Sequence, residues 1–433
     1  MQLKINRDLM AARQRDFAAK LFYSLMRGLA EAGREICDIG STVEIDSLEA
    51  DPINQVVERA HAESMKLGEY SRYASSWGTI ELRNAISGFF AKRGVSNIDP
   101  KTEVMVSRGI VDSVDKVIAS LDITHVVIPS CAPYYAETFS VLRRKEIIVA
   151  PLNLMTGSLD LEVLRARLMA SGGVKGKVLM YITHPSAPAG TAMSDRFIEN
   201  QLIPFLRKNG IWLVSDSYIS ATRFDGKTIR PILSFAGAKD VAVEAITVSK
   251  ELGLPSARAG GIAGNAQIIE AVRIYAATMI DTVALPSQRL AAMALDEIDP
   301  AIAGNRIEQE LKDEILPRFE AMQWPVIVPK AGIDMLLSVP PGFIRRGVRD
   351  PALVASFSIL RRFGIAFFPC TVFSNDKSGR FNLRLVLKQR MGKIPRALDS
   401  LSKQGFNWRS DKPCEKDLAF LRAKVANLDL TKL

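Results

Sequence analysis

Cysteine and histidine are scarce in this sequence. The four cysteines among the 433 residues show no C-x-x-C spacing, which favours free thiols over a disulfide framework or a zinc site. Three histidines are too few to predict a histidine-rich metal centre. We therefore expect no metal at the functional site.

Long apolar runs are also missing. No run approaches the roughly 18 residues of a membrane span. The first 34 residues carry Arg, Lys, Asp and Glu among their apolar positions, unlike a secretory signal peptide. There is no visible internal repeat or low-complexity tract. These absences favour a folded protein of the cytoplasm that does not contact a membrane.

The charge is basic but dispersed. The sequence has 57 Lys and Arg and 47 Asp and Glu, which gives a net charge of +10. Such a charge could bind nucleic acid, an acidic membrane surface or small anions. The basic residues are spread along the chain, and adjacent pairs such as Arg143-Arg144 are short. We interpret them as a solvated surface and expect no nucleic-acid partner.

Hydrophobic patterning predicts an α/β fold. From about residue 104, short apolar runs such as VMVS (104–107), KVLMYIT (177–183) and IWLVSD (211–216) alternate with helical periods. Near-continuous apolar strands separated by helices indicate a mainly parallel sheet that is buried on both faces.

The pattern of predicted helices and strands changes after Pro286. Long helical segments are followed by strand candidates such as DMLLSVP (334–340) and FNLRLVL (381–387), a mixture typical of a smaller α+β domain. The N-terminal residues contain a helix over about 8–32 and too little sheet to stand alone. We predict an N-terminal arm and part of the small domain over 1–72, a large ligand-binding domain over 73–322 and a C-terminal small domain over 323–433.

The stretch TVSKELGLPSARAGG (247–261) is the first indication of chemistry. By itself, Lys250 would be interpreted as a lysine that reaches solvent from a strand end. In a partly desolvated pocket, however, a lysine amine loses its charge more readily and attacks carbonyls. Thr247, Ser249 and Arg258 add hydroxyl donors and a fixed cation suited to a phosphate. The combination favours Schiff-base chemistry.

Other strand ends carry residues that complement Lys250, and ligands of open α/β sheets bind at such ends. Gly109 opens a helix, so the backbone at Ile110 and Val111 suits a phosphate, although such a glycine more often reflects backbone geometry alone. Tyr134 offers a ring for stacking or for core packing. Asp216 ends an apolar strand and needs a cation, a helix end or donors. An aldehyde-binding lysine, a carboxylate for a ring nitrogen, an aromatic face and phosphate donors together predict pyridoxal 5′-phosphate.

These motifs, in this order, resemble those of the fold-type I pyridoxal-phosphate enzymes, specifically the class I and II aminotransferases, over nearly the whole chain. The family's S-x-S-K, with an arginine eight residues on, is similar to Thr247 to Lys250 followed by Arg258. Further matches are Asp216 with FDG at 224–226, Y-x-x-x-x-G-x-x-x-L-R at 73–83, and P-x-x-x-F at 369–373 followed by Arg384-Leu385. The resemblance implies a mainly parallel seven-stranded sheet between helices, a smaller α+β domain and a homodimer with shared active sites.

The resemblance also implies a role for each matching residue. Lys250 would form the Schiff base and shuttle the substrate proton, Asp216 would keep the pyridine nitrogen protonated, and Arg384 would clamp the carboxylate of an amino-acid substrate. The substrate side chain would lie near Ile39, Gly40 and the following residues to 44. The residues expected to hold the cofactor are Ile110, Val111, Thr247, Ser249, Arg258, Tyr134 (or Tyr135, if the alignment shifts by one) for stacking, and Tyr73 from a second subunit.

Two departures from the family pattern bear on the reaction. The second asparagine of the family's N-P-x-N-P-x-G turn is Ala187, and the tyrosine expected three residues after the strand-end aspartate is Ile219. Both usual donors to the cofactor's ring oxygen are therefore missing. Ser186, His184 and Tyr218 are the candidates to replace them.

Three functions remain open on this basis. The preferred one is an aminotransferase acting on an α-amino acid. The segment SKELGLPSARAG is also similar to the corresponding segment of aminocyclopropane-carboxylate synthases. The alternative is therefore a non-transaminating enzyme of secondary metabolism. Such an enzyme would carry out elimination or cyclisation on S-adenosylmethionine, or an oxidation. The third is a ligand sensor. Sensors of this fold carry a separate DNA-binding module, and only about seventy residues precede Tyr73, so the third function is disfavoured.

Overall fold

The structure is a computed structural model of the chain. It describes residues 17–42, 50–173, 175–219, 222–345, 347–374, 376 and 378–419. The expected N-terminal helix is seen as α2 (Phe17–Glu31). Positions 8–16 of that expected helix, and positions 43–44 of the expected substrate pocket, lie outside the described residues.

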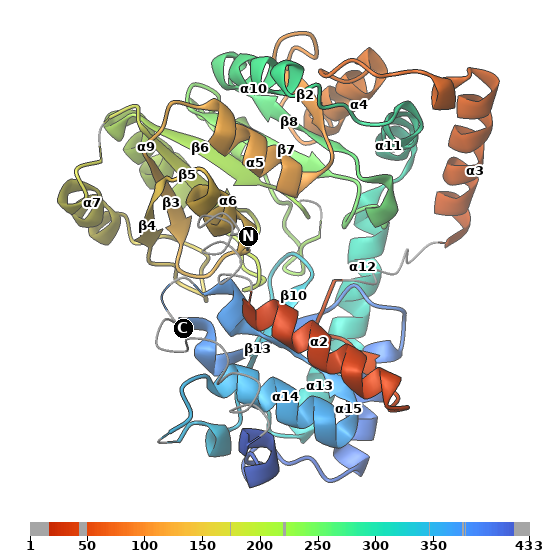
Figure 1. The fold of residues 1–433 in the computed structure, drawn as a ribbon, viewed down its shortest axis with the longest axis vertical. Coiled ribbons are helices and arrows are strands. Elements are labelled where there is room, and N and C mark those ends of the chain that lie inside the picture. The colour runs from red at the N-terminus through yellow and green to blue at the C-terminus, as the bar shows by residue number, and fades with distance from the viewer. Residues whose placement is uncertain are drawn as a thin grey trace, which may run out of the picture.

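Seven strands form the main sheet, in the order β2-β8-β7-β6-β5-β3-β4 (Figure 1). They are β2 (Val104–Ser107), β3 (His125–Pro129), β4 (Glu146–Ala150), β5 (Val178–Thr183), β6 (Ile211–Asp216), β7 (Ala242–Thr247) and β8 (Gly260–Gly264). Neighbouring strands pair in parallel except at β8, which runs antiparallel to β2 and β7. The predicted α/β fold with a mainly parallel seven-stranded sheet is confirmed.

Side chains alternate between two hydrophobic layers along these strands. In β5, Leu179 and Tyr181 join one core, whereas Met180 and Ile182 join the core on the opposite face. The first face is covered by α5 (Ile110–Ser120), α6 (Tyr135–Leu142) and α10 (Ala266–Thr278). The second is covered by α4 (Ile80–Ala91), α7 (Leu161–Ala170), α8 (Asp195–Phe197), α9 (Ile203–Asn209) and α11 (Leu285–Glu297), with α3 (Ala50–Lys66) packed outside α11. Burial of both faces explains why the strands are almost continuously apolar.

A smaller α+β unit has a core of its own. Its four-stranded sheet has the order β12-β13-β10-β9, built from β9 (Val326–Ile327), β10 (Asp334–Ser338), β12 (Phe368–Pro369) and β13 (Asn382–Val386). Around it lie α2, α12 (Pro300–Glu310), α13 (Leu316–Ala321), α14 (Pro351–Phe363) and α15 (Lys393–Lys403). The short β1 (Cys37–Asp38) pairs in parallel with β11 (Ile365–Ala366) and ties the segment after α2 to this unit.

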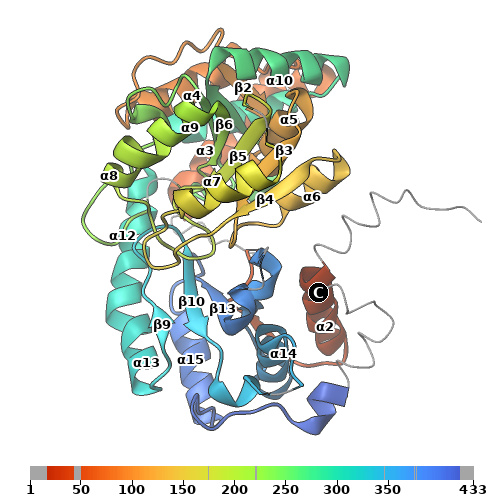
Figure 2. The same cartoon turned by 90° about the vertical axis from the view of Figure 1, so that its left-hand side faces the viewer.

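The two units are joined along one side of the molecule. In both views α12 extends from the seven-stranded domain down to the smaller one (Figure 1, Figure 2). Ile307 and Phe319, from α12 and α13, are buried in the core of the smaller unit. No helix within the described ranges is long and apolar enough to traverse a lipid bilayer.

Candidate active site

Most of the predicted site residues line one cavity of about 300 Å³ between the two units. Segments that follow β5, β6 and β7 meet there with β13 of the smaller sheet, as the strand-end rule for α/β sheets leads one to expect. The predicted residues on its wall are Ile110, Val111, Tyr134, Thr247, Ser249, Lys250, Arg258 and Arg384.

One end of the cavity collects donors that suit an anion. Helix α5 begins after Gly109, whose φ of 91° lies in the range that glycine tolerates. A Cβ at Gly109 would come within 3.1 Å of Thr247 Oγ1, so glycine also keeps this corner open. The Thr247 hydroxyl lies 2.9 Å from Ser249 Oγ and 3.1 Å from the Ala259 carbonyl. Arg258 adds a cation, held by a backbone φ of 47° that non-glycine residues rarely adopt.

Lys250 lies three residues beyond the end of β7, at the centre of this group. Its Nζ donates a hydrogen bond of 3.1 Å to the carbonyl of Thr42. Burial lowers the pKa of Lys250 to about 8, and the neighbouring cations Arg384 and Arg258 add to this effect, which Asp334 partly offsets. About a tenth of this amine is therefore unprotonated at pH 7, far more than at the ordinary pKa of a lysine, and attack on an aldehyde requires the unprotonated form.

Asp216, at the end of β6, is fully buried and accepts hydrogen bonds from two tyrosines. The Tyr181 hydroxyl donates to its Oδ2 at 2.8 Å, and the Tyr135 hydroxyl donates to the same oxygen. Burial raises the pKa of Asp216 to about 6, although these hydrogen bonds act to lower it. Sequence reasoning missed both tyrosine contacts. The available signal was Tyr181, a polar ring inside an apolar strand.

Arg384, on β13, is paired with an acid that sequence reasoning also missed. Its Nε donates to Oδ1 of Asp334 at 2.6 Å, and its Nη2 lies 2.6 Å from the same oxygen. The Tyr218 hydroxyl donates to Oδ2 of Asp334 at 2.6 Å. Burial alone would lower the pKa of Arg384, but the Asp334 carboxylate outweighs it and the pKa is raised. The signal in the sequence was an aspartate that opens the apolar strand DMLLS.

Four predicted residues are not on the wall of this cavity: Asp216, which lies behind Tyr135, and Ile39, Gly40 and Tyr73. Ile39 is fully buried in the core of the smaller unit, and Gly40 packs so tightly on the next strand that a Cβ would come within 2.2 Å of the Phe368 nitrogen. Neither residue is on the wall of the cavity, whereas Thr42 of the same segment lines it; that Ile39 and Gly40 contact the substrate stays a prediction. Tyr73 is 99% exposed and does not line the cavity of its own subunit.

The departures at the ring-oxygen position persist in the structure. Ala187 lines the cavity without a polar group, and Ile219 is buried in the core of the smaller unit. Tyr218 lines the cavity, but its hydroxyl proton goes to Asp334. His184 Nδ1 and Ser186 Oγ are buried without a hydrogen-bond partner among the described residues, and neither side chain lines the cavity.

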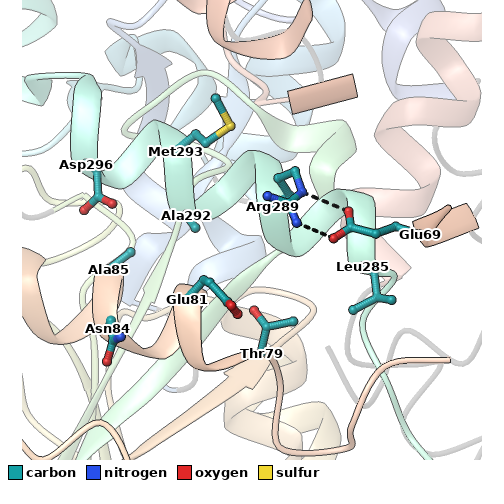
Figure 3. A pocket seen from close by; sticks show the side chains of 10 residues that line it. All are labelled: Glu69, Thr79, Glu81, Asn84, Ala85, Leu285, Arg289, Ala292, Met293 and Asp296. Carbon is teal, nitrogen blue, oxygen red and sulfur yellow. Dashed lines mark hydrogen bonds and ion pairs between the residues drawn. The ribbon is translucent and has the colours of Figure 1, made fainter. Parts of the chain in front are cut away.

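A second cavity, of about 460 Å³, lies between α4 and α11 (Figure 3). Arg289 on α11 pairs with Glu69, through Nε to Oε2 at 3.0 Å, and reaches Glu63 of α3 at 3.2 Å. The hydrogen bonds from Arg289 lower the pKa of Glu69. This cavity is larger, but the residues that line it include no lysine and no cysteine.

The first cavity fits a cofactor with a phosphate, an aldehyde and a ring nitrogen. The start of α5, the hydroxyls of Thr247 and Ser249, and Arg258 suit a phosphate. Lys250 supplies the amine and Asp216 the carboxylate. The described residues contain no cluster of three His, Cys, Asp or Glu side chains able to hold a metal ion.

Comparison with known proteins identifies the class of this chain. The model of the aminotransferase class I and II family matches residues 44–392, so the chain belongs to that family. It is a pyridoxal-phosphate-dependent transferase.

Individual relatives are moderately similar. The chain is 27% identical over 342 residues to an L-glutamine--4-(methylsulfanyl)-2-oxobutanoate aminotransferase of Bacillus subtilis, which covers 78% of this chain and 82% of the relative. It is 27% identical over 391 residues to an LL-diaminopimelate aminotransferase of Moorella thermoacetica, with 88% and 95% of the two chains covered. These comparisons support an aminotransferase and give no support to the non-transaminating alternative.

Solved structures agree on the fold. BacF of Bacillus subtilis, solved without ligand, superimposes with a TM-score of 0.80 at 19% identity, covering 95% of this chain and 100% of BacF. A Thermus thermophilus aspartate aminotransferase mutant gives 0.75 at 16% identity, covering 93% and 100%.

Proposed function

We propose that this aminotransferase exchanges the amino group of an α-amino acid with a 2-oxo acid at the cavity that holds Lys250 and Arg384. The observation that carries this proposal is the opening of both side chains into one cavity, beside a buried carboxylate at Asp216. When bound, pyridoxal phosphate withdraws electrons from the α-carbon of the amino acid.

The protein's own residues then have separable tasks. Lys250 binds the cofactor aldehyde and carries a proton to and from the α-carbon, which its lowered pKa favours. Asp216 holds the proton on the ring nitrogen. Arg384 binds the substrate carboxylate. The start of α5 at Ile110 and Val111, with Thr247, Ser249 and Arg258, holds the phosphate.

Ring stacking is proposed for Tyr134. Both Tyr134 and Tyr135 line the cavity, but the hydroxyl of Tyr135 is engaged with Asp216. Because both rings belong to the same turn, a Tyr134→Ala variant that binds the cofactor as tightly as wild type would move this role to Tyr135.

We further propose that the active enzyme is a cytoplasmic homodimer in which Tyr73 serves the cavity of the partner subunit. The near-complete exposure of Tyr73 supports this, and so do the exposed apolar side chains around it. Tyr70 is 56% exposed and Trp77 is 41% exposed. Exposed aromatic clusters of this kind mark interfaces.

The division into domains also remains a proposal. The boundaries predicted from sequence are 1–72, 73–322 and 323–433. Because Ile307 and Phe319 are buried in the core of the smaller unit, we propose to move the end of the large domain toward Asp299.

A single experiment tests the proposed reaction. Purified protein with pyridoxal phosphate is mixed in turn with each common L-amino acid, and the visible spectrum and released 2-oxo acid are followed. We expect loss of the lysine-linked absorbance, release of one 2-oxo acid per site, and recovery of the spectrum when a second 2-oxo acid is added. The proposal fails if no amino acid releases an oxo acid, or if Lys250→Ala retains the wild-type spectrum and borohydride-reducible adduct.

A further inference from the structure

The carboxylate-binding arginine of this site is neutralised before any substrate arrives. Asp334 and Arg384 are diagonal neighbours on one face of the smaller sheet, since Asp334 pairs with Val386 and Leu336 pairs with Arg384 across β10 and β13. Asp334 is fully buried and Arg384 is 7% exposed, so the attraction between the two charges is weakly screened.

The contacts of this pair leave one end of the guanidinium for a ligand. Nε and Nη2 both face Oδ1 of Asp334. Within the described part of the chain, Nη1 of Arg384 makes no hydrogen bond, and the side chain lines the cavity. The planar group therefore has one edge occupied by Asp334 and one end open to the cavity.

The neighbouring wall is aromatic. Phe373 lies under the guanidinium, with 5.0 Å from the Arg384 Cζ to the ring centroid. Phe368 follows, 6.1 Å from Phe373 between centroids, and Tyr23 of α2 lies 5.3 Å from Phe368. A substrate whose carboxylate meets Nη1 places its side chain near this wall.

We propose that Asp334 is a specificity-determining residue, which makes the site select amino acids that carry one carboxylate and an apolar side chain. The inference rests on the proposed function, because it takes Arg384 as the carboxylate site. The paired charges sum to zero, so a single carboxylate is accepted through Nη1 without strong attraction. A second carboxylate meets the negative charge of Asp334 and an aromatic wall.

The other basic residues on the described wall are Lys250 and Arg258. Both are committed to the cofactor in the proposed function, so they do not neutralise a second acid. One consequence is that glutamate is a poor amino donor for this enzyme.

Calorimetric titration of the holoenzyme with 3-phenylpropionate and with succinate tests the proposal. We expect wild type to bind 3-phenylpropionate at least tenfold more tightly than succinate. Asp334→Asn keeps the shape and one acceptor for Arg384 but removes the charge. It should tighten succinate binding about tenfold and 3-phenylpropionate binding about threefold, because the dianion gains more from the lost repulsion. The ratio of the two affinities, 3-phenylpropionate over succinate, then decreases about threefold.

Asp350→Asn is the matched control. Asp350 caps α14 in the same unit, where it accepts a hydrogen bond from Leu353, and asparagine caps helices equally well. It does not line the cavity. This variant should leave both affinities and their ratio unchanged.

The proposal is overturned if wild type binds succinate as tightly as 3-phenylpropionate, or if Asp334→Asn leaves the ratio unchanged or weakens both ligands. If Asp334→Asn fails to fold, the proposal is tested on the wild-type enzyme alone, through the change of its visible spectrum on addition of amino acids. L-norleucine must then half-saturate the spectral change at a concentration at least tenfold below that of L-glutamate. If no amino acid changes the spectrum, the proposed function itself fails; if glutamate is preferred, only the role of Asp334 fails.

Discussion

The Tyr181 hydroxyl lies 2.8 Å from Oδ2 of Asp216, inside the sheet and out of contact with solvent. Together with Tyr135, it supplies donors that favour the charged carboxylate in a place where burial disfavours it. The carboxylate must be charged to attract a protonated ring nitrogen. The two tyrosines therefore set how far toward acid pH the cofactor stays bound.

Replacing Tyr181 by phenylalanine should weaken cofactor binding more at low pH than at high pH. The pKa of Asp216 is about 6 and rises further when a donor is lost, so more of the carboxyl group is neutral at pH 6. A hydrogen bond to a charged group contributes roughly 1.5–3 kcal/mol, so the apoenzyme should bind pyridoxal phosphate about tenfold more weakly at pH 6. Little change is expected at pH 8.5. Absorbance titration at both pH values measures this.

Tyr275→Phe is the control for this change. The Tyr275 hydroxyl, on α10, accepts a hydrogen bond from Arg143 that the substitution removes, and Tyr275 does not line the cavity. The Tyr275→Phe apoenzyme should bind pyridoxal phosphate with the affinity of wild type at both pH values. Equal weakening of Tyr181→Phe at pH 6 and pH 8.5 would show that Asp216 ionisation is not involved.

Lys250 should reduce the stability of the apoenzyme. Its pKa is about 8 in the folded protein and near 10.4 in an unfolded chain, so the unfolded chain binds more protons between these values. Stability lost at neutral pH is therefore recovered as pH rises from 8 to above 10. We compare the free energy of unfolding of apo Lys250→Met with that of the apo wild type. The variant minus wild-type difference should be about 2–3 kcal/mol more favourable to the variant at pH 7 than at pH 10.5.

Urea unfolding of both proteins at the two pH values checks this, with Lys312→Met as a surface control. Lys312 is 57% exposed at its side chain, so the same substitution there should give the same difference at both pH values. A pH-independent effect of Lys250→Met would mean that packing, rather than charge, explains its stability.

The fold and much of the site could be predicted because their signals are local. Apolar runs define the strands of the main sheet, and the residues that follow each run lie at its ligand-binding edge. Lys250, Asp216 and Arg258 therefore needed only their own sequence neighbourhoods and the strand-end rule.

The remaining contacts depend on pairings between distant segments. Asp334 reaches Arg384 only because β10 and β13 pair in one register, and a shift by one residue would turn Asp334 to the other face. Ile39 is buried in the core of the smaller unit because the chain before it pairs as β1 with β11. No local pattern specifies either pairing.

Gly109→Ala should impair cofactor binding beyond its effect on stability. The substitution forces an L residue to a φ of 91° and brings its Cβ within 3.1 Å of Thr247 Oγ1, at the proposed phosphate site. We expect at least a tenfold loss of affinity for pyridoxal phosphate. Gly33→Ala is the matched control, since φ is 80° and no atom lies within 4 Å of the added Cβ. It should cost about 1 kcal/mol of stability without changing cofactor affinity; similar affinities of the two variants would exclude a special role for Gly109.

Mixed dimers test whether Tyr73 serves the other subunit. Lys250→Ala and Tyr73→Ala should each be nearly inactive as pure dimers if the site needs Lys250 from one subunit and Tyr73 from the other. Refolding equal amounts together should produce hybrids in about half of the dimers, each with one native site and one doubly altered site. Activity should then recover to about a quarter of wild type, measured as 2-oxo acid released per subunit. If Tyr73 acted within its own chain, every site in the mixture would carry one defect, and activity would stay at the average of the two parent variants.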